Sequence, residues 1–389
     1  MLLETIHELK NNYNEVIIGA GLIGLKTAQD IKKAFPENKI LFLDIEKPEN
    51  LKELNKIGDT LIINWGEKEF MKEVSKKIGK EAKIYICIST KGDSNEDYLF
   101  ADFLNKYFSN NPIIVRSTFD TGFFYSIESK SKAVVPERYS PGDNLKFKLT
   151  YWSTERLKSY IEKIFKVEYS PYPIAVILSK IFENTQRYIL ISLMNSFEMY
   201  YKNLCSPYEI EGEKRDIFNE IIRICELKDN FAGGIQPGLI GGECIGVDNK
   251  YLNTGVKPLW KAADNINEDY YQYKLNYLKK IIFEFLDKTD NHGEIVLIGG
   301  EYKDNVKGKG ALKNSPKYKL IMDLKSTLEK LFRKTPLIIN TINSKTSEEL
   351  SYKLNTLSSK TLIIVITKHD YIEEELKKLN SNYNVIYLK

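Results

Sequence analysis

The sequence predicts an α/β protein with a doubly wound parallel sheet in its N-terminal part, a helical central part and a smaller α/β part at its C-terminal end. Three observations predict this fold class. Short apolar runs alternate with amphipathic stretches up to about residue 170, long helical patterns follow up to about residue 288, and the alternation then resumes. The 389 residues are enough for two or three domains, and we expect their bounds at residues 1–170, 171–288 and 289–389.

The N-terminal part contains six short runs that are nearly continuous in apolar residues. A parallel strand that is buried on both faces requires such a run. Two amphipathic stretches with helical spacing, Leu22–Ala34 and Glu67–Ile78, lie between the runs. The expected strands are Glu15–Gly19, Lys39–Asp44, Thr60–Asn64, Lys83–Ser89, Pro112–Ser117 and Lys132–Val135.

The central part begins at Pro173, which suits a first helical turn because the N–H that proline lacks would have no acceptor there. The expected helices are Pro173–Leu204, Glu213–Leu227 and Pro258–Leu286, and the glycine-rich stretch Ala232–Val247 precedes the last one. Apolar runs then resume and predict a second, smaller parallel sheet with the strands Glu294–Gly299, Pro336–Asn340, Thr361–Thr367 and Asn384–Leu388.

The composition argues against several classes of function. The net charge of +4 is small for this length and most lysines have acidic neighbours, so we expect no nucleic-acid partner. The cysteines have no zinc-site spacing and histidine is nearly absent, so we expect no metal. We find no apolar run long enough for a membrane span and no leader at the start of the chain. These features predict a cytoplasmic protein with free thiols.

A glycine-rich turn joins the first expected strand to the first expected helix. Its pattern G-x-G-x-x-G permits a tight turn and a close approach of the backbone to a pyrophosphate, which the helix N-terminus would bind. Asp44 ends the next strand, where a carboxylate hydrogen-bonds the adenosine ribose and disfavours a 2′-phosphate. This context predicts a Rossmann-like domain that binds NAD, although a purely structural turn is the alternative. The expected contacts are Gly19, Gly21, Leu22, Ile23, Gly24 and Asp44.

A cysteine bracketed by glycines, Cys244, lies in the stretch Gly238–Asp248. Backbone amides in such a turn can point at the sulfur and make the thiol more acidic. Asp248 follows four residues later, on the same face if the segment is helical. A thiolate beside a carboxylate suits covalent catalysis followed by hydrolysis. A small buried hydrophobic side chain in a loop is the alternative, and the spacing alone does not decide between the two.

Six motifs, in order, make the chain resemble the UDP-glucose/GDP-mannose dehydrogenase family over nearly its whole length. The glycine turn and the cysteine loop are two of the six. The valine before Asp248 and the Pro-Glu-Arg at positions 136–138 are more similar to the UDP-N-acetylhexosamine dehydrogenases within this family. The motifs are Gly19–Gly24, Arg116–Thr118, Pro136–Gly142, Lys180–Arg187, Gly241–Asp248, and Tyr302–Asn305 with Ser315–Pro316.

The resemblance implies an NAD-dependent four-electron oxidation of the C6 alcohol of a nucleotide sugar to the uronic acid, in the synthesis of surface polysaccharide precursors. Cys244 would attack the intermediate aldehyde to give a thiohemiacetal, and a second hydride loss would leave a thioester that water hydrolyses. Lys180 and Asn184 share one face of a helix at positions i and i+4. They would stabilise the oxyanions that develop along this path.

The resemblance also implies roles for neighbouring residues. Asp248 would transfer protons, and Thr118 and Glu137 would position the water or the sugar. The partner would be a UDP-sugar, and because family members are commonly dimers we expect a homodimer built through the central helices. Further cofactor contacts would come from Ser89, Thr90, Thr118 and Lys313. Substrate contacts would come from Glu137, Arg138, Tyr139, Lys180, Asn184, Gly241 and Lys303.

The sequence departs from the family pattern at positions that affect substrate identity more than chemistry. Lys313 stands where arginine is usual, Glu243 where related acetamido-sugar enzymes usually have histidine, and Gly246 replaces a common proline. The alternatives are a UDP-glucose 6-dehydrogenase, an inactive nucleotide-sugar-binding homologue and a β-hydroxyacid dehydrogenase. The cysteine loop and the third domain argue against the β-hydroxyacid dehydrogenase.

Overall fold

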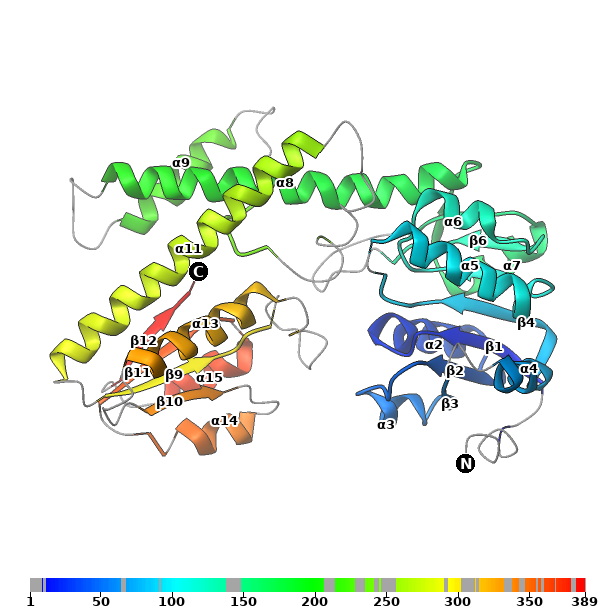
Figure 1. Ribbon diagram of the computed structural model, residues 1–389, viewed down its shortest axis with the longest axis horizontal. Coiled ribbons are helices and arrows are strands. Elements are labelled where there is room, and N and C mark those ends of the chain that lie inside the picture. The colour runs from blue at the N-terminus through cyan, green and yellow to red at the C-terminus, as the bar shows by residue number, and fades with distance from the viewer. Residues whose placement is uncertain are drawn as a thin grey trace. The chain divides into compact units, whose positions relative to one another are not determined.

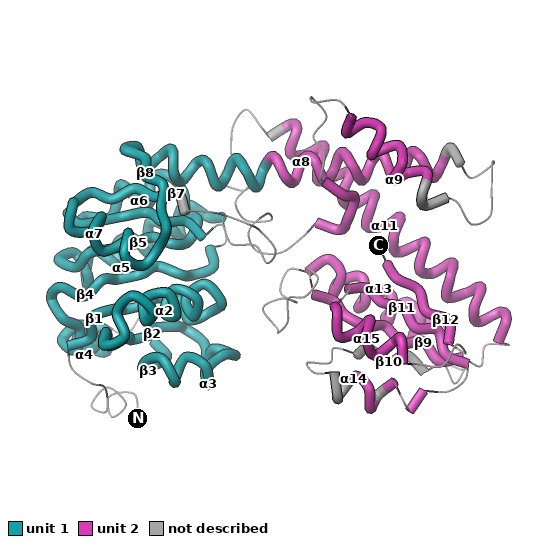
Figure 2. Tube along the Cα trace, turned by 180° about the vertical axis from the view of Figure 1, so that it is seen from behind, with its two compact units in different colours: residues 1–185, 247–252 teal, residues 186–246, 253–389 magenta. Residues whose placement is uncertain are grey.

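The structure is a computed structural model that describes most of the chain. The contacts divide the chain into two compact units (Figure 2), residues 1–185 with 247–252 and residues 186–246 with 253–389. Each unit contains one of the two sheets. The described residues are 9, 12–63, 68–90, 92–137, 148–205, 214–227, 235–240, 245, 257–289, 293–301, 312, 315–331, 338–342, 347–354, 356–357, 360–367, 369–378 and 383–388.

The first unit is built on a sheet with the strand order β3-β2-β1-β4-β5-β6-β7-β8. Neighbouring strands pair in parallel except β6 with β7, which are antiparallel. The chain builds outward from β1 to β3, returns to β4 and continues in the other direction. Open α/β sheets bind their ligands at such a reversal, which lies here at the carboxyl ends of β1 and β4. The strands are β1 (Tyr13–Ile18), β2 (Ile40–Asp44), β3 (Asp59–Ile62), β4 (Ile78–Ile86), β5 (Ile113–Val115), β6 (Lys132–Val134), β7 (Lys148–Trp152) and β8 (Val167–Tyr169).

Helices cover both faces of this sheet, as Figure 1 shows. Residues of α4, α5 and α6 pack with Val16 and Ile18 of β1 in one apolar layer. Residues of α2 and α7 pack with Ile17 in the other layer. Because successive side chains of a strand point to opposite faces, one apolar run supplies both layers. The helices are α2 (Leu22–Ala34), α3 (Leu51–Leu54), α4 (Lys68–Lys77), α5 (Ser94–Phe108), α6 (Thr121–Ser126) and α7 (Glu155–Ile164).

The helical part consists of α8 (Pro173–Cys205), α9 (Lys214–Cys225) and α11 (Lys257–Lys288). The boundary between the units falls within α8, so this helix contributes residues to both. Its first turns pack Val176, Ile177 and Ile181 against the apolar layer of the first sheet that also contains β1 residues. No helix of the described residues is long and apolar enough to cross a membrane.

The second unit contains a parallel sheet with the strand order β10-β9-β11-β12. Side chains of α11 and α13 cover one face of this sheet, and side chains of α14 and α15 cover the other. The strands are β9 (Glu294–Ile298), β10 (Ile338–Ile342), β11 (Thr361–Val365) and β12 (Asn384–Tyr387), and the helices are α13 (Pro316–Leu331), α14 (Ser347–Leu354) and α15 (Asp370–Lys378).

The predicted fold class is confirmed: a large, mainly parallel sheet, a helical part with a long helix, and a smaller parallel sheet. The sequence analysis did not predict β7 and β8. The three side chains of β8 are half-buried or exposed, so this strand lacks the continuous apolar run by which the other strands of the sheet were recognised. The division into three domains stays a prediction.

Candidate functional site

The glycine turn follows β1 directly. Gly19 has φ of +97°, which L side chains rarely adopt. A Cβ at this position would lie 2.4 Å from the carbonyl oxygen of Cys87, at the carboxyl end of β4. A Cβ at Gly24, in the first turn of α2, would lie 2.0 Å from the carbonyl oxygen of Gly19. Both glycines are therefore required by the close packing of the turn.

The outer side of the turn is open. No atom lies within 4 Å of the place where a Cβ of Gly21 would stand. Helix α2 begins at Leu22, which is 62% exposed, and its first turn contains no acidic residue. The first N–H groups of a helix have no acceptor within the helix, and they carry its positive dipole end. This combination suits a phosphate group.

Asp44 stands at the end of β2 beside this turn. Its Oδ2 accepts a hydrogen bond of 2.7 Å from the N–H of Ala20, and its Oδ1 accepts one of 2.7 Å from the N–H of Ile45. These bonds fix a carboxylate next to the glycine turn. A carboxylate has further lone pairs with which it can accept hydrogen bonds from ribose hydroxyls.

The loops that follow β4 and β5 are tied to each other. The hydroxyl of Thr90 donates to the carbonyl oxygen of Thr118 over 2.9 Å. The hydroxyl of Ser117 donates to the carbonyl oxygen of Ile88 over 2.6 Å. Ser89, which lies between Ile88 and Thr90 in the sequence, is exposed. The predicted residues Ser89, Thr90 and Thr118 thus lie at the same carboxyl edge of the sheet as the glycine turn.

Glu137 follows β6 and forms a buried ion pair with Arg116. Its N–H also donates to the carbonyl oxygen of Arg116 over 3.1 Å. The guanidinium of Arg116 is fully buried, and its central carbon lies 4.6 Å from the ring centre of Phe165. The sequence motif contained Arg116 without giving it a role. An arginine at the end of an apolar run was the signal that could have indicated a buried partner.

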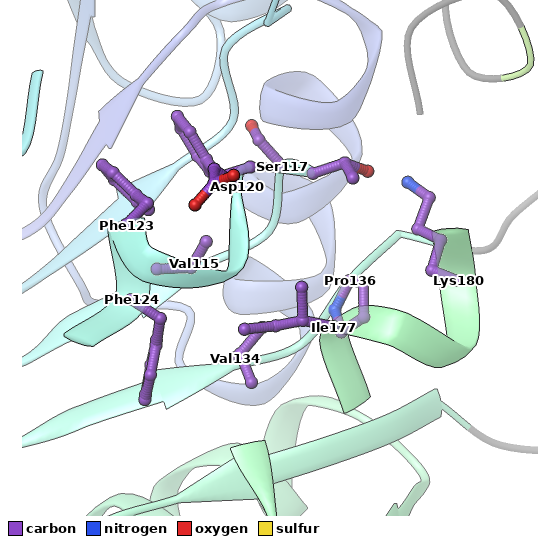
Figure 3. Close-up of a pocket in the computed structure, with 11 residues that line it drawn as sticks. Val115, Ser117, Asp120, Phe123, Phe124, Val134, Pro136, Ile177 and Lys180 are labelled. Carbon is purple, nitrogen blue, oxygen red and sulfur yellow. The ribbon is translucent and has the colours of Figure 1, made fainter. Parts of the chain in front are cut away.

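Lys180 projects from the first part of α8 into a small pocket of the first unit, although its side chain is buried. In Figure 3 it extends from α8 toward the loop that carries Ser117. Thr118 and Pro136, the residue before Glu137, line the same pocket. Asn184 is half-buried one helical turn further along α8. The structure therefore brings Lys180 and Thr118 together.

The wall of this pocket is largely apolar and includes the side chains of Phe123, Val134 and Ile177, and the carboxylate of Asp120 lines it as well. A cationic group with apolar neighbours attracts negative charge more strongly than one in water, because the surrounding dielectric constant is low. An oxyanion that came within reach of the Lys180 ammonium group would therefore be stabilised.

Seven predicted site residues lie outside the described residues, and their positions stay predictions. They are Cys244, Asp248, Arg138, Tyr139, Gly241, Lys303 and Lys313. In the part of the chain that the structure describes, no group of three or more histidine, cysteine, aspartate or glutamate side chains could hold a metal ion.

Comparisons with known proteins identify related dehydrogenases. No family model matches the chain. The sequence is 28% identical over 215 residues to a UDP-N-acetyl-D-glucosamine 6-dehydrogenase of Salmonella typhi, covering 50% of this chain and 46% of that protein. It is 26% identical over 189 residues to the Pseudomonas aeruginosa protein of the same name, covering 44% and 42%. The matched segments thus span less than half of either relative.

Solved structures match over a larger part of the chain. The UDP-D-ManNAc dehydrogenase of Pyrococcus horikoshii has a TM-score of 0.63 at 17% identity, covering 96% of this chain and 94% of that one. A UDP-N-acetyl-mannosamine dehydrogenase from S. aureus has a TM-score of 0.62 at 17% identity, covering 96% and 98%. At this identity the structures show the fold alone. The sequence matches show a likeness to UDP-N-acetyl-D-glucosamine 6-dehydrogenases over about half of the chain.

Proposed function

We propose that this protein is an NAD-dependent 6-dehydrogenase that oxidises a UDP-N-acetylhexosamine to its uronic acid. The observation that carries the proposal is the arrangement at the carboxyl edge of the first sheet. This edge carries an open glycine turn with Asp44 beside it, and it also carries a pocket lined by Lys180 and Thr118. The names of the sequence relatives support the acetamido-sugar substrate.

The residues of the first unit fit a dinucleotide. The free N–H groups at the start of α2 would bind the pyrophosphate, and the empty space above Gly21 would let it approach the backbone. Asp44 would accept hydrogen bonds from the adenosine ribose, and its charge would repel the 2′-phosphate of NADP. The bound cofactor supplies the hydride acceptor for each oxidation.

The proposed chemistry divides one oxidation into covalent steps. Asp248 takes the proton of the C6 alcohol as the C6 hydride departs, which leaves an aldehyde. The thiolate of Cys244 adds to the aldehyde carbon, and departure of a second hydride gives a thioester. Water adds to the thioester, the C–S bond breaks and the carboxylate leaves. Two hydrides depart for each sugar, so the reaction consumes two cofactors and one water.

Lys180 and Asn184 are the proposed oxyanion-stabilising residues. The oxygen on C6 becomes negative when the thiolate adds, and again when water adds. A preorganised cation in a largely apolar pocket stabilises such charge without reorganising at the moment of reaction. The burial of Lys180 supports this role more than a place on a solvated helix face would.

The test is the stoichiometry of NADH formation. Purified protein is incubated with NAD and limiting amounts of UDP-N-acetylglucosamine, UDP-N-acetylmannosamine, their galacto epimers or UDP-glucose, and NADH is followed by its absorbance. We expect two NADH per molecule of an acetamido sugar. One NADH would favour a simple alcohol dehydrogenase, a preference for UDP-glucose would change the substrate, and none with any sugar would contradict the proposal.

The role of the thiol needs its own variants. Cys244→Ser should stop the release of free acid, because an alkoxide adduct cannot proceed to a thioester. Cys225→Ser is the matched control, since Cys225 is a free, half-buried thiol on α9 and should leave the rate unchanged. Normal acid formation by Cys244→Ser would remove this residue from the mechanism.

A further inference from the structure

The loop that follows β5 forms one wall of the pocket that contains Lys180. Residues 117–120 of this loop line the pocket, and Figure 3 shows Ser117 and Asp120 there together with Lys180. The cavity has a volume of about 10 Å³, close to the least that a water molecule needs. Even a small shift of the loop therefore changes what the pocket can admit and where Thr118 stands with respect to Lys180.

A buried carboxylate on α5 holds the backbone of this loop. Asp97 lies in the first turn of α5 and is only 4% exposed. Its Oδ2 accepts a hydrogen bond of 2.9 Å from the N–H of Asp120, a residue 23 positions away. Burial of a carboxylate is unfavourable unless hydrogen bonds compensate for the lost hydration, and the loop supplies one such bond. The loop is thus fixed to a helix that lies far from it in the sequence.

The side chain of Asp120 is held by the same helix. Its Oδ2 accepts from the hydroxyl of Ser94 over 3.0 Å, and its Oδ1 accepts from the hydroxyl of Tyr98 over 3.3 Å. The charge of Asp120 raises the pKa of the Tyr98 phenol, which therefore keeps the proton that it donates. Oδ1 also accepts from the N–H of Gly122 over 2.8 Å and so caps α6. Both the backbone and the side chain of this loop residue are therefore tied to the start of α5.

Thr118 lies between this attachment and a second one. Its carbonyl oxygen accepts from the hydroxyl of Thr90, in the loop after β4, over 2.9 Å. Only Phe119 separates Thr118 from Asp120, and consecutive Cα atoms are about 3.8 Å apart. A displacement of Asp120 is therefore transmitted to Thr118 with little room for the chain to absorb it.

We propose that Asp97 is a positioning residue that sets the place of Thr118 in the Lys180 pocket. The inference rests on the proposed function, in which Lys180 stabilises the oxyanion and this pocket belongs to the reaction site. Asp97 is not among the residues that line the pocket, so it acts through the backbone of Asp120 and not on the reacting groups. Loss of its hydrogen bond releases the loop while Thr118 and Lys180 stay in the chain.

The central pair of variants is Asp97→Leu and Asp97→Asn. Leucine has no acceptor, whereas asparagine keeps an oxygen that can accept from the N–H of Asp120. In the full-length protein we expect kcat with the UDP-sugar to fall about 100-fold in Asp97→Leu, the effect of a misplacement of about 1 Å at a reacting group. In Asp97→Asn it should stay within about threefold of the wild type, because the hydrogen bond is retained. KM should change less than kcat in both variants, because the loss concerns the reacting geometry more than binding.

Hydrogen exchange of the loop provides a readout that needs no substrate. Exchange is followed by mass spectrometry on peptides that cover residues 116–124. It should be faster by about tenfold in Asp97→Leu, because the N–H of Asp120 has lost its acceptor and opens more often. Asp97→Asn should exchange like the wild type.

Asp93→Ala is the matched control for stability. Asp93 caps α5, the same helix, by accepting from the N–H of Asn95 over 2.9 Å. Its loss should lower the midpoint of urea unfolding and leave kcat and the exchange of residues 116–124 unchanged, since the bond between Asp97 and Asp120 remains. If Asp97→Leu does not fold, Asp97→Ala, which also lacks an acceptor, carries the same expectation.

Three outcomes would overturn the proposal. The first is a folded Asp97→Leu protein with wild-type kcat, and the second is a loss of kcat without faster exchange of the loop. The third is an equal loss of kcat in Asp97→Leu and Asp93→Ala, which would mean that any weakening of α5 reduces activity. If the wild type oxidises no UDP-sugar, the proposed function fails, and the exchange rates alone decide whether Asp97 holds the loop.

Discussion

Each of the two sheets has a glycine with positive φ directly after its first strand: Gly19 at +97° after β1 and Gly299 at +88° after β9. Each glycine packs against the chain that leaves the neighbouring strand. A Cβ at Gly19 would lie 2.4 Å from the carbonyl oxygen of Cys87, and one at Gly299 would lie 2.8 Å from the N–H nitrogen of Thr367. The two turns therefore use glycine for the same steric reason.

The turns differ in what happens to the backbone amides that follow. In the first, the carboxylate comes from another strand, Asp44, and the space around Gly21 stays open. In the second, the N–H of Gly300 donates to the carboxylate of the next residue, Glu301, over 3.0 Å, and to the hydroxyl of Thr367 over 3.2 Å. A positive-φ glycine after a strand thus defines a turn, whereas only a turn with open amides offers a binding site.

The buried charges near the two turns differ as well. Near the first turn, Glu137 pairs with the fully buried guanidinium of Arg116. Near the second, Glu301 lies 3.1 Å from Nε2 of the buried His369. The first carboxylate is therefore paired with a planar guanidinium, and the second with an imidazole ring.

The largest expected effect comes from breaking the buried pair of Arg116 and Glu137. Arg116→Met should lower the free energy of unfolding by about 3–5 kcal/mol, because it leaves Glu137 buried without its partner. The double variant Arg116→Met with Glu137→Leu should recover most of this loss, since an apolar pair needs no desolvation. Urea unfolding measures both. A double variant as unstable as the single one would mean that the guanidinium matters through packing alone.

Activity measurements distinguish a catalytic role of Glu137 from a purely structural role of its pair with Arg116. If Glu137 acts on the water or the sugar, the stable double variant should still be inactive. A double variant that is both stable and active would restrict the pair to a structural role.

The next effect distinguishes the two glycine turns. Gly19→Ala and Gly299→Ala should each lower the free energy of unfolding by about 2–3 kcal/mol, because each adds a Cβ in a left-handed conformation against backbone. Gly21→Ala should leave stability within about 0.5 kcal/mol, since its Cβ meets no atom. Chemical unfolding gives the three values.

The affinity for NAD should rank two of these variants in the opposite order: Gly21→Ala, the more stable one, should bind NAD more weakly than Gly299→Ala. Titration calorimetry with NAD should show weaker binding for Gly21→Ala, whose new Cβ occupies the proposed place of the pyrophosphate. Gly299→Ala should bind NAD like the wild type. Equal NAD affinity of Gly21→Ala and wild type would exclude the open side of the first turn as the pyrophosphate site.

The first turn was predictable because its parts occur in one local pattern. Gly19, Gly24 and Asp44 lie within two strands and a helix that are consecutive in the sequence. The pairing of Arg116 with Glu137 was not predictable, because the residues are 21 positions apart and meet only when β5 and β6 lie side by side. Hydrophobic periodicity places strands in a sheet order only weakly, and it does not identify which polar side chains will share a buried space.

The candidate site was predictable in part. The spacing of Lys180 and Asn184 indicated one face of a helix, and the resemblance assigned them a role. That Lys180 shares a pocket with Thr118 follows from the packing of α8 on the first sheet, which involves residues far apart in the sequence. The two hydrogen bonds between the side chain of Asn195 and the backbone of Gly238 are of the same kind, because 43 positions separate these residues. Buried side-chain hydrogen bonds of this range have no local signature.

Two buried carboxylates, one in each unit, should give opposite responses to pH. Burial raises the pKa of Glu15 in β1 to about 7. Burial also opposes the ionisation of Glu301, but hydrogen bonds from His369 and the N–H of Gly300 outweigh it and lower the pKa of Glu301. A raised folded pKa makes stability fall as pH increases from about 4.5 to about 7, whereas a lowered one makes stability fall as pH decreases below about 4.5.

Single amide substitutions test this difference. Glu15→Gln should become more stable than the wild type as pH increases from about 5 to 8, by about 2 kcal/mol at the upper end. Glu301→Gln should be less stable than the wild type at pH 7, with a difference that shrinks as pH decreases toward 3. Urea unfolding across this range gives both curves. Parallel curves would mean that the two carboxylates have similar environments.

The smallest expected effect concerns Asp44, the carboxylate that distinguishes the open turn from the closed one. Asp44→Asn keeps an oxygen that can accept from the N–H of Ala20, so the turn should retain its shape. Loss of the negative charge should weaken NAD binding by about tenfold, because hydrogen bonds to a charged acceptor are stronger than those to a neutral one. It should also reduce the preference for NAD over NADP, since the charge that repels the 2′-phosphate is then gone.

The matched control is Glu301→Gln. The carboxylate of Glu301 already accepts from the N–H of Gly300 in its own turn, so this variant should leave both affinities unchanged. Calorimetric titration with each dinucleotide measures the four values. An unchanged preference in Asp44→Asn would show that the cofactor is selected elsewhere, and that the carboxylate beside the first turn serves only to hold Ala20.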